Sequence, residues 1–554
     1  MSGKTILMSG AAVLLALGTA HAQTTVTLHK HKRHHQPVVI TKNLAPAAPS
    51  GGMSDGALAA SASPPSASDA NAGLEARVRR LEEQLDAEQG KEEAEHTRLT
   101  TLEQSFGDTQ WSFDNARPTV KSGDGRFSLA IRVRFQFDDI NYFQDSDVNT
   151  VTPTRNVQYK DLSSGALVRR AFFGVEGKAF NDFWYELRYN AGGGGSAETD
   201  PRLSLARVAY LGVPNFELNV GVIEPAFMYE GTMSSGQLPF LERPEIDNIA
   251  ADSFGAGDSR KGIEARYQKQ GALMPDDNLV LDAALTGSKT ESTVGHGNGG
   301  DEQTQALAHA AYRFWSDGNS NISLSGDYAH AFTGGCAACA PGAVNPINLQ
   351  DRPQFREDGD RLVSTGSLNA KTADMWAISG GMNFANFYAG GEYARFTVDR
   401  LPVLSGGVVA FRRDNPEFSG WYIEGSWVIT GEPKSYTVSA TNNEVGGFGA
   451  PKVVSPFSWS GDSWGAWELT ARYSDTDLNW NETRIADPLT LTQAGIAGGE
   501  ERIIMLGLNW YLNNNVKLQL NDGITHVSKI AAPGSNVQVG QDLNVLGVRL
   551  QFTN

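Results

Sequence analysis

The amino-acid sequence predicts an all-β fold, a sixteen-stranded antiparallel transmembrane β-barrel preceded by a short α-helical coiled coil. First, apolar and polar residues alternate with a period of two from residue 111 to residue 554, as in half-exposed strands. Second, the connections between the predicted strands alternate between short and long, which is typical of outer-membrane barrels. Third, after residue 20 no apolar run approaches the ~20 residues of a spanning helix. The mean hydropathy of −0.33 agrees, because alternating barrel strands average out as hydrophilic.

The charge balance argues against a nucleic-acid binder. The 554 residues include 46 Lys and Arg against 63 Asp and Glu, a formal net charge of −17. Binding to nucleic acid requires clustered basic residues that neutralise phosphates. We therefore expect no nucleic-acid partner.

Residues 1–22 predict a secretory signal peptide. Lys4 precedes an apolar stretch at 6–17, and an A-x-A triplet at 20–22 provides a cleavage pattern. A short buried helix is the alternative. In an exported chain, a small loop disulfide is favoured over a zinc or redox site for the two cysteines, Cys336 and Cys339.

Residues 23–73 have the composition of a disordered linker, rich in Ala, Pro, Ser and Gly after a basic run at 29–35. The four histidines of that run could hold a copper or zinc ion. A solvated tail near an anionic surface is the favoured interpretation, so the sequence predicts no metal site and no cofactor.

Residues 74–106 predict a short coiled coil. Apolar residues recur there at alternating spacings of four and three, which is the heptad pattern of a helix that packs against another helix. Glu88, Glu92 and Glu95 interrupt the middle of this apolar seam and weaken it. An oligomerisation stalk is favoured over a single amphipathic helix that lies on a globular domain. The apolar positions are Leu74, Val78, Leu81, Leu85, Leu99, Leu102 and Phe106.

The barrel domain is expected at 111–554. In the segment FSLAIRVRFQFD at 127–138, the apolar residues share one face and the charged residues share the other. Aromatic residues gather at the short turns, as in an interfacial girdle. A soluble sandwich array or propeller would need an internal repeat, and none is seen. One connection breaks the alternation of short turns and long loops. It spans 431–463 and is long, although the strand count places it on the short-turn side. The predicted strands are 127–138, 166–180, 183–190, 203–212, 216–224, 261–269, 278–287, 304–314, 321–331, 373–383, 387–396, 420–430, 464–475, 500–511, 516–526 and 542–552.

Five segments of this region resemble the bacterial phosphate-selective porin O and P family and follow the order of that family. The resemblance implies a trimeric, sixteen-stranded outer-membrane channel whose third extracellular loop, here 225–258, folds inward and narrows the pore. The segments are RRAFFGVEGKAFNDFWYELRY at 169–189, GVIEPAFMYEGTMSSGQLPFLERP at 221–244, GWYIEGSWVITGE at 420–432, GAWELTARYSDTDL at 465–478 and GLNWYLNNNVKLQLN at 507–521.

The resemblance implies that basic residues line the pore and give it an anion preference. Acidic residues lie on the same strand faces, and many of these charges could simply pair across neighbouring strands. The candidate pore-lining residues are Arg132, Arg134, Arg170, Lys178, Arg188, Arg266, Arg472 and Lys517.

The expected constriction loop departs from the family pattern in its charge. Where the family usually has a lysine shortly before the loop, this chain has Glu224, and 225–258 holds six carboxylates against Arg243 alone. A ring of carboxylates favours cations. We therefore expect weak or mixed ion selectivity. The sign of the net charge at the constriction depends on how many of these acids pair with wall arginines. The residues expected at the constriction are Glu224, Glu230, Glu242, Arg243, Glu245 and Asp247.

The resemblance implies an outer-membrane porin, which is a passive channel for small hydrophilic solutes and ions, with anions such as phosphate as candidates. The expected partners are outer-membrane lipid, the permeating solutes and two further copies in a homotrimer, with the N-terminal region in the periplasm of a Gram-negative cell. The alternatives are a barrel that tethers the outer membrane to periplasmic partners and a barrel hydrolase. Against the hydrolase, and for a protein that is not an enzyme, the sequence has no H-E-x-x-H or Walker motif and few histidines in the barrel.

Overall fold

The computed structural model describes residues 67–144, 149–152, 155–193, 202–255, 258–288, 302–332, 346–405, 408–411, 414–487 and 493–554. The predicted signal peptide, most of the predicted linker, and Cys336 and Cys339 with their predicted disulfide lie outside these residues. Among the described residues, no helix is both long and apolar enough to cross a membrane.

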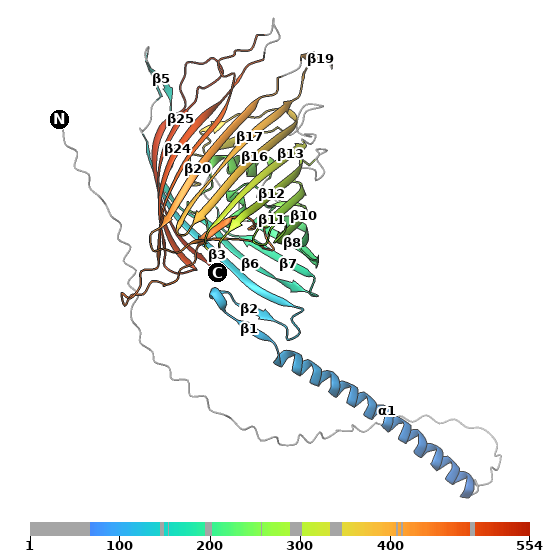
Figure 1. Ribbon diagram of the computed structural model, residues 1–554. Helices are drawn as coiled ribbons and strands as arrows, with labels where there is room; N and C mark the ends of the chain where they lie inside the picture. The colour runs from blue at the N-terminus through green and yellow to red at the C-terminus, as the bar shows by residue number, and fades with distance from the viewer. Residues whose placement is uncertain are drawn as a thin grey trace, which may run out of the picture. The chain divides into compact units, whose positions relative to one another are not determined.

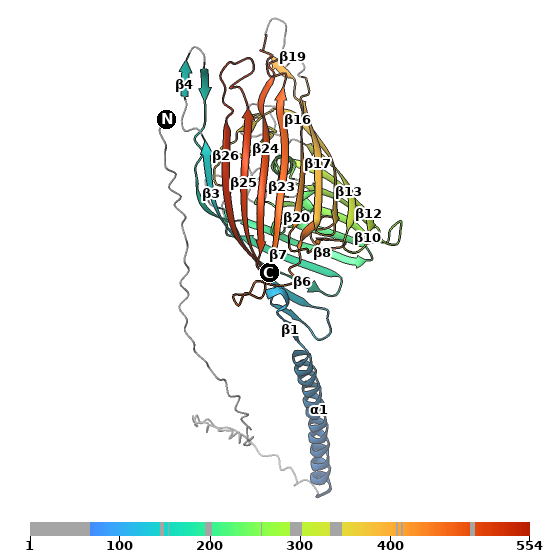
Figure 2. The same cartoon turned by 60° about the vertical axis from the view of Figure 1, so that its left-hand side comes forward.

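Sixteen antiparallel strands close into a β-barrel (Figures 1 and 2), which confirms the predicted fold class. Each strand pairs with its neighbours along the chain, and the last strand pairs with the first, so that Leu543 lies opposite Gln144. The barrel strands are β3 (Ser128–Gln144), β6 (Gly165–Ala179), β7 (Phe183–Asn190), β8 (Arg202–Val213), β9 (Phe216–Ile223), β10 (Arg260–Gln270), β11 (Asn278–Thr286), β12 (Thr304–Ser316), β13 (Asn321–Phe332), β16 (Ala370–Phe384), β17 (Phe387–Arg400), β20 (Glu417–Val428), β23 (Ala466–Trp480), β24 (Ile496–Tyr511), β25 (Val516–Ser528) and β26 (Asp542–Thr553).

The alternation within each strand places apolar side chains outside and polar side chains inside. In β3, Phe135 and Phe137 are about 40% exposed, whereas Gln136 and Asp138 between them are buried. This distribution suits a barrel in lipid, where a charged side chain on the outer face costs ~2–4 kcal/mol at the bilayer midplane. The period of two therefore determines the face of a strand residue wherever the strand has no bulge.

Three long connections fill much of the barrel interior. The inward loop, residues 224–259 between β9 and β10, contains the 3₁₀ turn η2 (Glu230–Thr232) and the helix α2 (Glu245–Phe254). The β13–β16 connection contains β14 (Gln350–Asp351) and β15 (Val363–Ser364). The inner connection, residues 429–465 between β20 and β23, contains β21 (Lys434–Tyr436) and β22 (Phe448–Pro451). Their buried apolar residues, such as Phe240, Phe355 and Phe448, form one hydrophobic core with the wall.

The helix α2 has clear start and stop signals. Glu245 and Asp247 lie in its first turn, where carboxylates interact favourably with the helix dipole. Gly255 ends the helix with φ +68°, and its N–H donates to the carbonyl of Ala251. A glycine at this C′ position takes the left-handed conformation without a Cβ clash.

The N-terminal helix α1 spans Ala67–Gly107 and is longer than the predicted 74–106. Within this single chain, the apolar heptad positions from Leu74 to Leu99 are uncovered, with Leu74, Leu81 and Leu99 each about 60% exposed. The remaining short elements are β1 (Gln110–Ser112), η1 (Asp114–Ala116) and β2 (Thr119–Lys121), which precede β3, and the hairpins β4–β5 (Asn149–Thr152, Arg155–Gln158) and β18–β19 (Val403–Ser405, Val408–Phe411).

Candidate functional site

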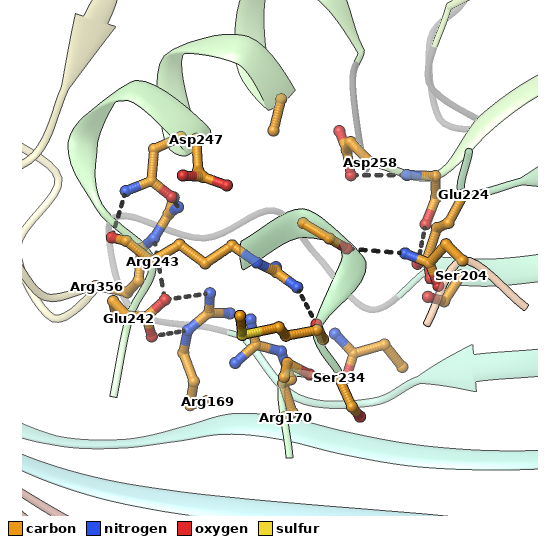
Figure 3. A pocket seen from close by; sticks show the side chains of 18 of the residues that line it. Arg169, Arg170, Ser204, Glu224, Ser234, Glu242, Arg243, Asp247, Asp258 and Arg356 are labelled. Carbon is orange, nitrogen blue, oxygen red and sulfur yellow. Dashed lines mark hydrogen bonds and ion pairs between the residues drawn. The ribbon is translucent and has the colours of Figure 1, made fainter. Parts of the chain in front are cut away.

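Among the described residues, two neighbouring cavities inside the barrel bring together most of the candidate residues. The long-loop cavity, about 260 Å³, lies among the inward loop, the β13–β16 connection and the wall (Figure 3). The short-turn cavity, about 380 Å³, lies beside the turn at 513–515 and the C-terminal residue Asn554. The two cavities share three lining residues, Arg134, Ser234 and Glu444. A solute that passes from one cavity to the other therefore meets these three side chains.

A β-bulge brings two consecutive arginines into the long-loop cavity. In the pairing of β3 with β6, Gln136 lies opposite Arg170 and Phe137 lies opposite Val168, so Arg169 is the extra residue. Arg169 and Arg170 consequently both reach the interior (Figure 3). Sequence alternation identified Arg170 and missed Arg169, because a strict period of two assigns Arg169 to the lipid face. No feature of the sequence marks this bulge.

Glu242 of the inward loop is neutralised by wall arginines. Arg169 donates to both of its carboxylate oxygens, at 2.6 and 3.0 Å, and Arg549 lies 3.1 Å from it. Burial by itself raises the pKa of Glu242, but the Arg169 and Arg170 guanidinium groups outweigh this and hold the pKa well below its usual range. Glu242 is therefore ionised, and the neighbouring guanidinium groups balance its negative charge.

Three other loop carboxylates form ion pairs with arginines of the wall and of the β13–β16 connection. Glu230 lies 3.3 Å from the Arg472 guanidinium. Near the ends of α2, Asp252 lies 3.4 Å from Arg361 and Asp258 lies 3.4 Å from Arg202. Glu230, Glu242, Asp252 and Asp258 therefore do not contribute to an unpaired acidic ring.

Glu245 and Asp247 of α2 are buried in a different environment. Burial raises the pKa of each carboxyl to about 7, although Arg472 opposes this at Glu245 and Arg243 opposes it at Asp247. Asp247 lines the long-loop cavity (Figure 3), whereas Glu245 lines neither cavity. Near neutral pH these two groups consequently carry only part of the negative charge that the sequence assigns to them.

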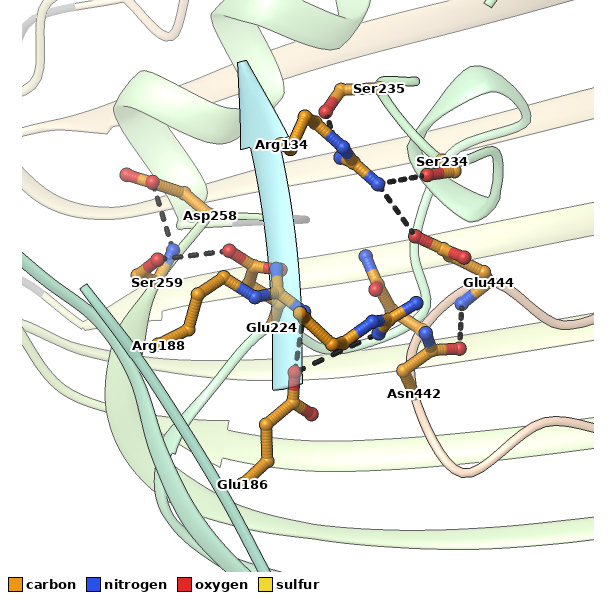
Figure 4. Close-up of polar contacts among 12 residues, drawn as sticks. Arg134, Glu186, Arg188, Glu224, Ser234, Ser235, Asp258, Ser259, Asn442 and Glu444 are labelled. Atoms are coloured by element: carbon orange, nitrogen blue, oxygen red, sulfur yellow. Dashed lines mark hydrogen bonds and ion pairs between the residues drawn. The ribbon is translucent and has the colours of Figure 1, made fainter. Parts of the chain in front are cut away.

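Arg134 of β3 is the central basic residue at the junction of the cavities (Figure 4). Its Nη1 donates to the Ser235 hydroxyl at 2.6 Å and its Nη2 donates to the Ser234 hydroxyl at 2.7 Å. A carboxylate oxygen of Glu444 lies 3.9 Å from the same Nη2. The inward loop thus fixes the Arg134 side chain, and the inner connection supplies the nearby negative charge.

The neighbouring arginines are paired with carboxylates of the wall and the inward loop. Arg188 lies 2.5 Å from Glu186 and 3.5 Å from Glu224, and it lines the long-loop cavity (Figure 4). Arg132 lies 3.2 Å from Glu176 and lines the short-turn cavity. Together with Arg134 they form a basic cluster, residues 132, 134 and 188, on the inner wall.

The structure brings five of the eight predicted pore-lining residues to the two cavities and places the other three elsewhere. Arg266 faces inward but is fully buried against Asp282 and Glu264 beneath the inner connection. Arg472 is covered by the inward loop, with Phe240 stacked 4.4 Å from its guanidinium carbon. Lys178 is exposed near a short turn, and neither Arg266, Arg472 nor Lys178 lines either cavity. An inward strand face does not ensure contact with the cavities, because the long connections cover much of the wall.

Lys517, in contrast, lines the short-turn cavity, where its Nζ donates to the carbonyl of Leu238 at 3.0 Å. The predicted constriction residues divide into two groups. Glu224, Glu242, Arg243 and Asp247 line the long-loop cavity, whereas Glu230 and Glu245 are buried between the loop and the wall.

Sequence reasoning missed the residues that connections other than the inward loop bring to the cavities. The β13–β16 connection brings Arg352, Arg356 and Arg361 to the long-loop cavity, and the inner connection brings Asn443 and Glu444. The sequence did contain a signal for the β13–β16 connection, because its three arginines lie within ten residues of one another. For Glu444 the only signal was the unusual length of a connection on the short-turn side.

Comparisons with known proteins agree with this architecture. Residues 144–553 match the model of a family described as phosphate-selective porin O and P. The chain is 20% identical to Porin O of Pseudomonas aeruginosa over 412 residues, which cover 72% of this chain and 83% of that protein. It is 23% identical to an uncharacterized protein of Caulobacter vibrioides over 441 residues, 78% of this chain and 75% of that protein.

Solved structures of outer-membrane proteins are also similar to this chain. The outer membrane channel DcaP of Acinetobacter baumannii superposes with a TM-score of 0.41 at 10% identity, over 78% of this chain and 99% of that one. In-vitro folded OmpT of Vibrio cholerae superposes with a TM-score of 0.41 at 9% identity, over 77% of this chain and 98% of that one.

Proposed function

The chain belongs to the phosphate-selective porin O and P family, and we propose that its channel prefers small oxyanions such as phosphate over cations. As a member of this family it is an outer-membrane porin, which passes small hydrophilic solutes and ions by passive diffusion. The preference for oxyanions rests on one observation above all. At the junction that both cavities share, Arg134 donates to Ser234, and it also donates to Ser235 of the long-loop cavity.

This group has the donors that an oxyanion needs. A guanidinium presents several N–H donors and a fixed positive charge, and each serine hydroxyl can donate one hydrogen bond. Ser234 lies at the cavity junction beside Arg134, and Ser235 lines the long-loop cavity. An anion at this junction would therefore contact one charged group and two neutral donors.

The charge balance of the long-loop cavity also supports an anion preference. Arg170 donates to the neutral Gln136 side chain at 2.8 Å. Arg243 donates to the backbone carbonyls of Glu230 and Met233, both at 2.9 Å. Among the contacts of the described residues, neither arginine forms an ion pair with a carboxylate, whereas Glu242 has several arginine partners. The excess of positive charge favours anions at the narrow part of a pore.

The proposal is tested by the reversal potential of the purified protein in a planar bilayer across a potassium chloride gradient. We expect the sign of an anion-preferring channel and a chloride current that inorganic phosphate blocks. Arg134→Gln should weaken this block roughly tenfold, since a hydrogen bond to a charged group contributes ~1.5–3 kcal/mol. Arg502→Gln, which changes an arginine that lines neither cavity, is the control. A reversal potential of the opposite sign in the wild-type channel contradicts the proposal.

We also propose that the protein has no catalytic activity. Residues 461–465 have the G-x-S-x-G spacing of a serine hydrolase, but the Ser463 hydroxyl donates to the carbonyl of Pro456 and not to a histidine. The segment lies in the inner connection and lacks the strand–turn–helix context in which that spacing forms a nucleophile. A second match, at 52–56, lies outside the described residues.

A homotrimer stabilised by α1 is the third part of the proposal. The exposed apolar seam of α1 is a surface that a parallel bundle of identical helices would cover. Deleting residues 23–106 should shift cross-linked protein from trimer toward monomer, and deleting 23–66 alone, which keeps the helix, is the matched control. If the trimer yield is the same after both deletions, the helix does not stabilise the oligomer.

A further inference from the structure

The inner connection crosses the barrel interior and is fixed to the opposite wall. Gln268 of β10 and Ala440 exchange two hydrogen bonds, at 3.0 and 3.1 Å, and Asn278 of β11 donates to the carbonyl of Val438 at 2.9 Å. Arg207 of β8 donates to the carbonyl of Thr441. The stretch 438–442 is therefore held by three wall strands, although the inner connection to which it belongs begins after β20 and ends before β23.

This anchored stretch places Glu444 at the junction of the cavities. The Glu444 N–H donates to the Asn442 side-chain oxygen at 3.1 Å, which tightens the turn (Figure 4). Its side chain is 22% exposed and lines both cavities. The carboxylate points toward Arg134 of the basic cluster (Figure 4). A carboxylate supplied from outside the wall thus occupies the position that a permeating anion would approach.

The contact of Glu444 with Arg134 is close but not a direct hydrogen bond. The two charged groups are 3.9 Å apart, while the hydrogen bonds of Arg134 at 2.6 and 2.7 Å go to Ser235 and Ser234. Burial raises the pKa of Glu444, but the Arg132 and Arg134 guanidinium groups outweigh burial and lower it, so the carboxylate stays ionised. The Glu444 carboxylate is therefore attracted to Arg134 without a hydrogen bond to it, and its hydrogen-bond partner at the junction is the Ser234 side chain.

We propose that Glu444 is a tethered counter-anion, which neutralises the Arg134, Ser234 and Ser235 group when the channel is empty and competes there with the permeating oxyanion. The inference rests on the proposed oxyanion preference. Competition keeps the resting affinity low enough for release, because conduction requires binding that allows exit as well as entry. The inner connection thereby determines how strongly the channel retains its solute.

The test compares the wild-type channel with three variants in planar bilayers, with inorganic phosphate as the probe and chloride as the current carrier. Glu444→Gln removes the charge at the junction and keeps the size of the side chain. Asp462→Asn removes one negative charge from an exposed part of the same connection, away from both cavities, and is the matched control. Folding of each variant is checked by the heat-dependent shift of its band in gel electrophoresis.

We expect Glu444→Gln to lower the phosphate concentration for half-block of the chloride current about tenfold, and to slow the exit of phosphate in single-channel records. Asp462→Asn should match the wild type. Glu444→Ala, which lacks the amide, should shift the block in the same direction if the charge is what matters.

The possible failures are distinguishable. Cation preference in the wild-type channel overturns the proposed function itself. An anion-preferring wild type in which Glu444→Gln blocks like Asp462→Asn overturns the tethered counter-anion alone. Weaker phosphate block in Glu444→Gln also overturns it, because Glu444 would then position Arg134 instead of competing with solute.

Discussion

Replacing Arg549 with methionine is expected to lower the free energy of unfolding by about 3–5 kcal/mol, because it leaves buried carboxylates without their partner. The Arg549 side chain is fully buried and donates to both oxygens of Asp138, each at 2.6 Å. It also lies 3.1 Å from Glu242 of the inward loop. Methionine fills most of the space but cannot compensate either charge, and Asp138 is only 3% exposed.

The loss is measured by urea unfolding of the barrel in detergent micelles, followed by tryptophan fluorescence. Arg502→Met is the matched control, since Arg502 is 49% exposed and pairs with Asp475 at the surface. We expect no measurable change for that variant. Adding Asp138→Asn to Arg549→Met should recover part of the lost stability. Equal midpoints for the two single variants would contradict the assignment of Arg549 as the buried partner.

Replacing Gly381 with alanine is expected to release the inward loop from the wall. A Cβ at this position of β16 would lie 1.4 Å from the Tyr229 hydroxyl oxygen, so the tyrosine has to move. Tyr229 is 1% exposed and its hydroxyl accepts a hydrogen bond from Tyr388 at 3.3 Å. Overpacking of this kind costs about 1–3 kcal/mol. We expect that loss of stability together with a larger single-channel conductance, because the displaced loop narrows the interior less.

Gly326→Ala on the adjacent strand β13 is the control, because its Cβ would have only one neighbour, at 3.7 Å. The unfolding midpoints and the single-channel conductances of both variants test whether Gly381→Ala releases the inward loop. If Gly381→Ala retains the wild-type conductance, Tyr229 is not what holds the loop. Combining Gly381→Ala with Tyr229→Phe, which removes the hydroxyl nearest the new Cβ, should recover part of the lost stability.

The strands were predictable from the sequence because each strand follows one local rule, the alternation of apolar and polar residues with a period of two. All sixteen predicted segments correspond to barrel strands, with β3 extending six residues beyond the predicted end at residue 138. The alternation also predicts which face points inward, so that Arg134 and Arg188 are found inside. Arg169 shows the limit of the rule, because a bulge moves one residue out of phase without leaving a signal in composition.

The interior could not be predicted, because it depends on pairings between residues far apart in the chain. Counting charges on the inward loop gave a strongly acidic constriction, whereas the structure pairs Glu242 with Arg169, 73 residues earlier. Glu444 contacts a serine and an arginine that come from two other elements. No local pattern specifies such contacts, since they form only once the connections have folded into the closed barrel.

The pairing of the last strand with the first also constrains the order in which the molecule is built. The bonds between Arg549 and Asp138 join residues 411 positions apart, so they form only after the C-terminus has been synthesised. Until then β3 has an unpaired edge that can pair with other chains. Contacts at such separations form slowly and leave partly folded chains prone to aggregation. Carriers that shield this edge during transit to the membrane would therefore matter more for this protein than for one whose contacts are local.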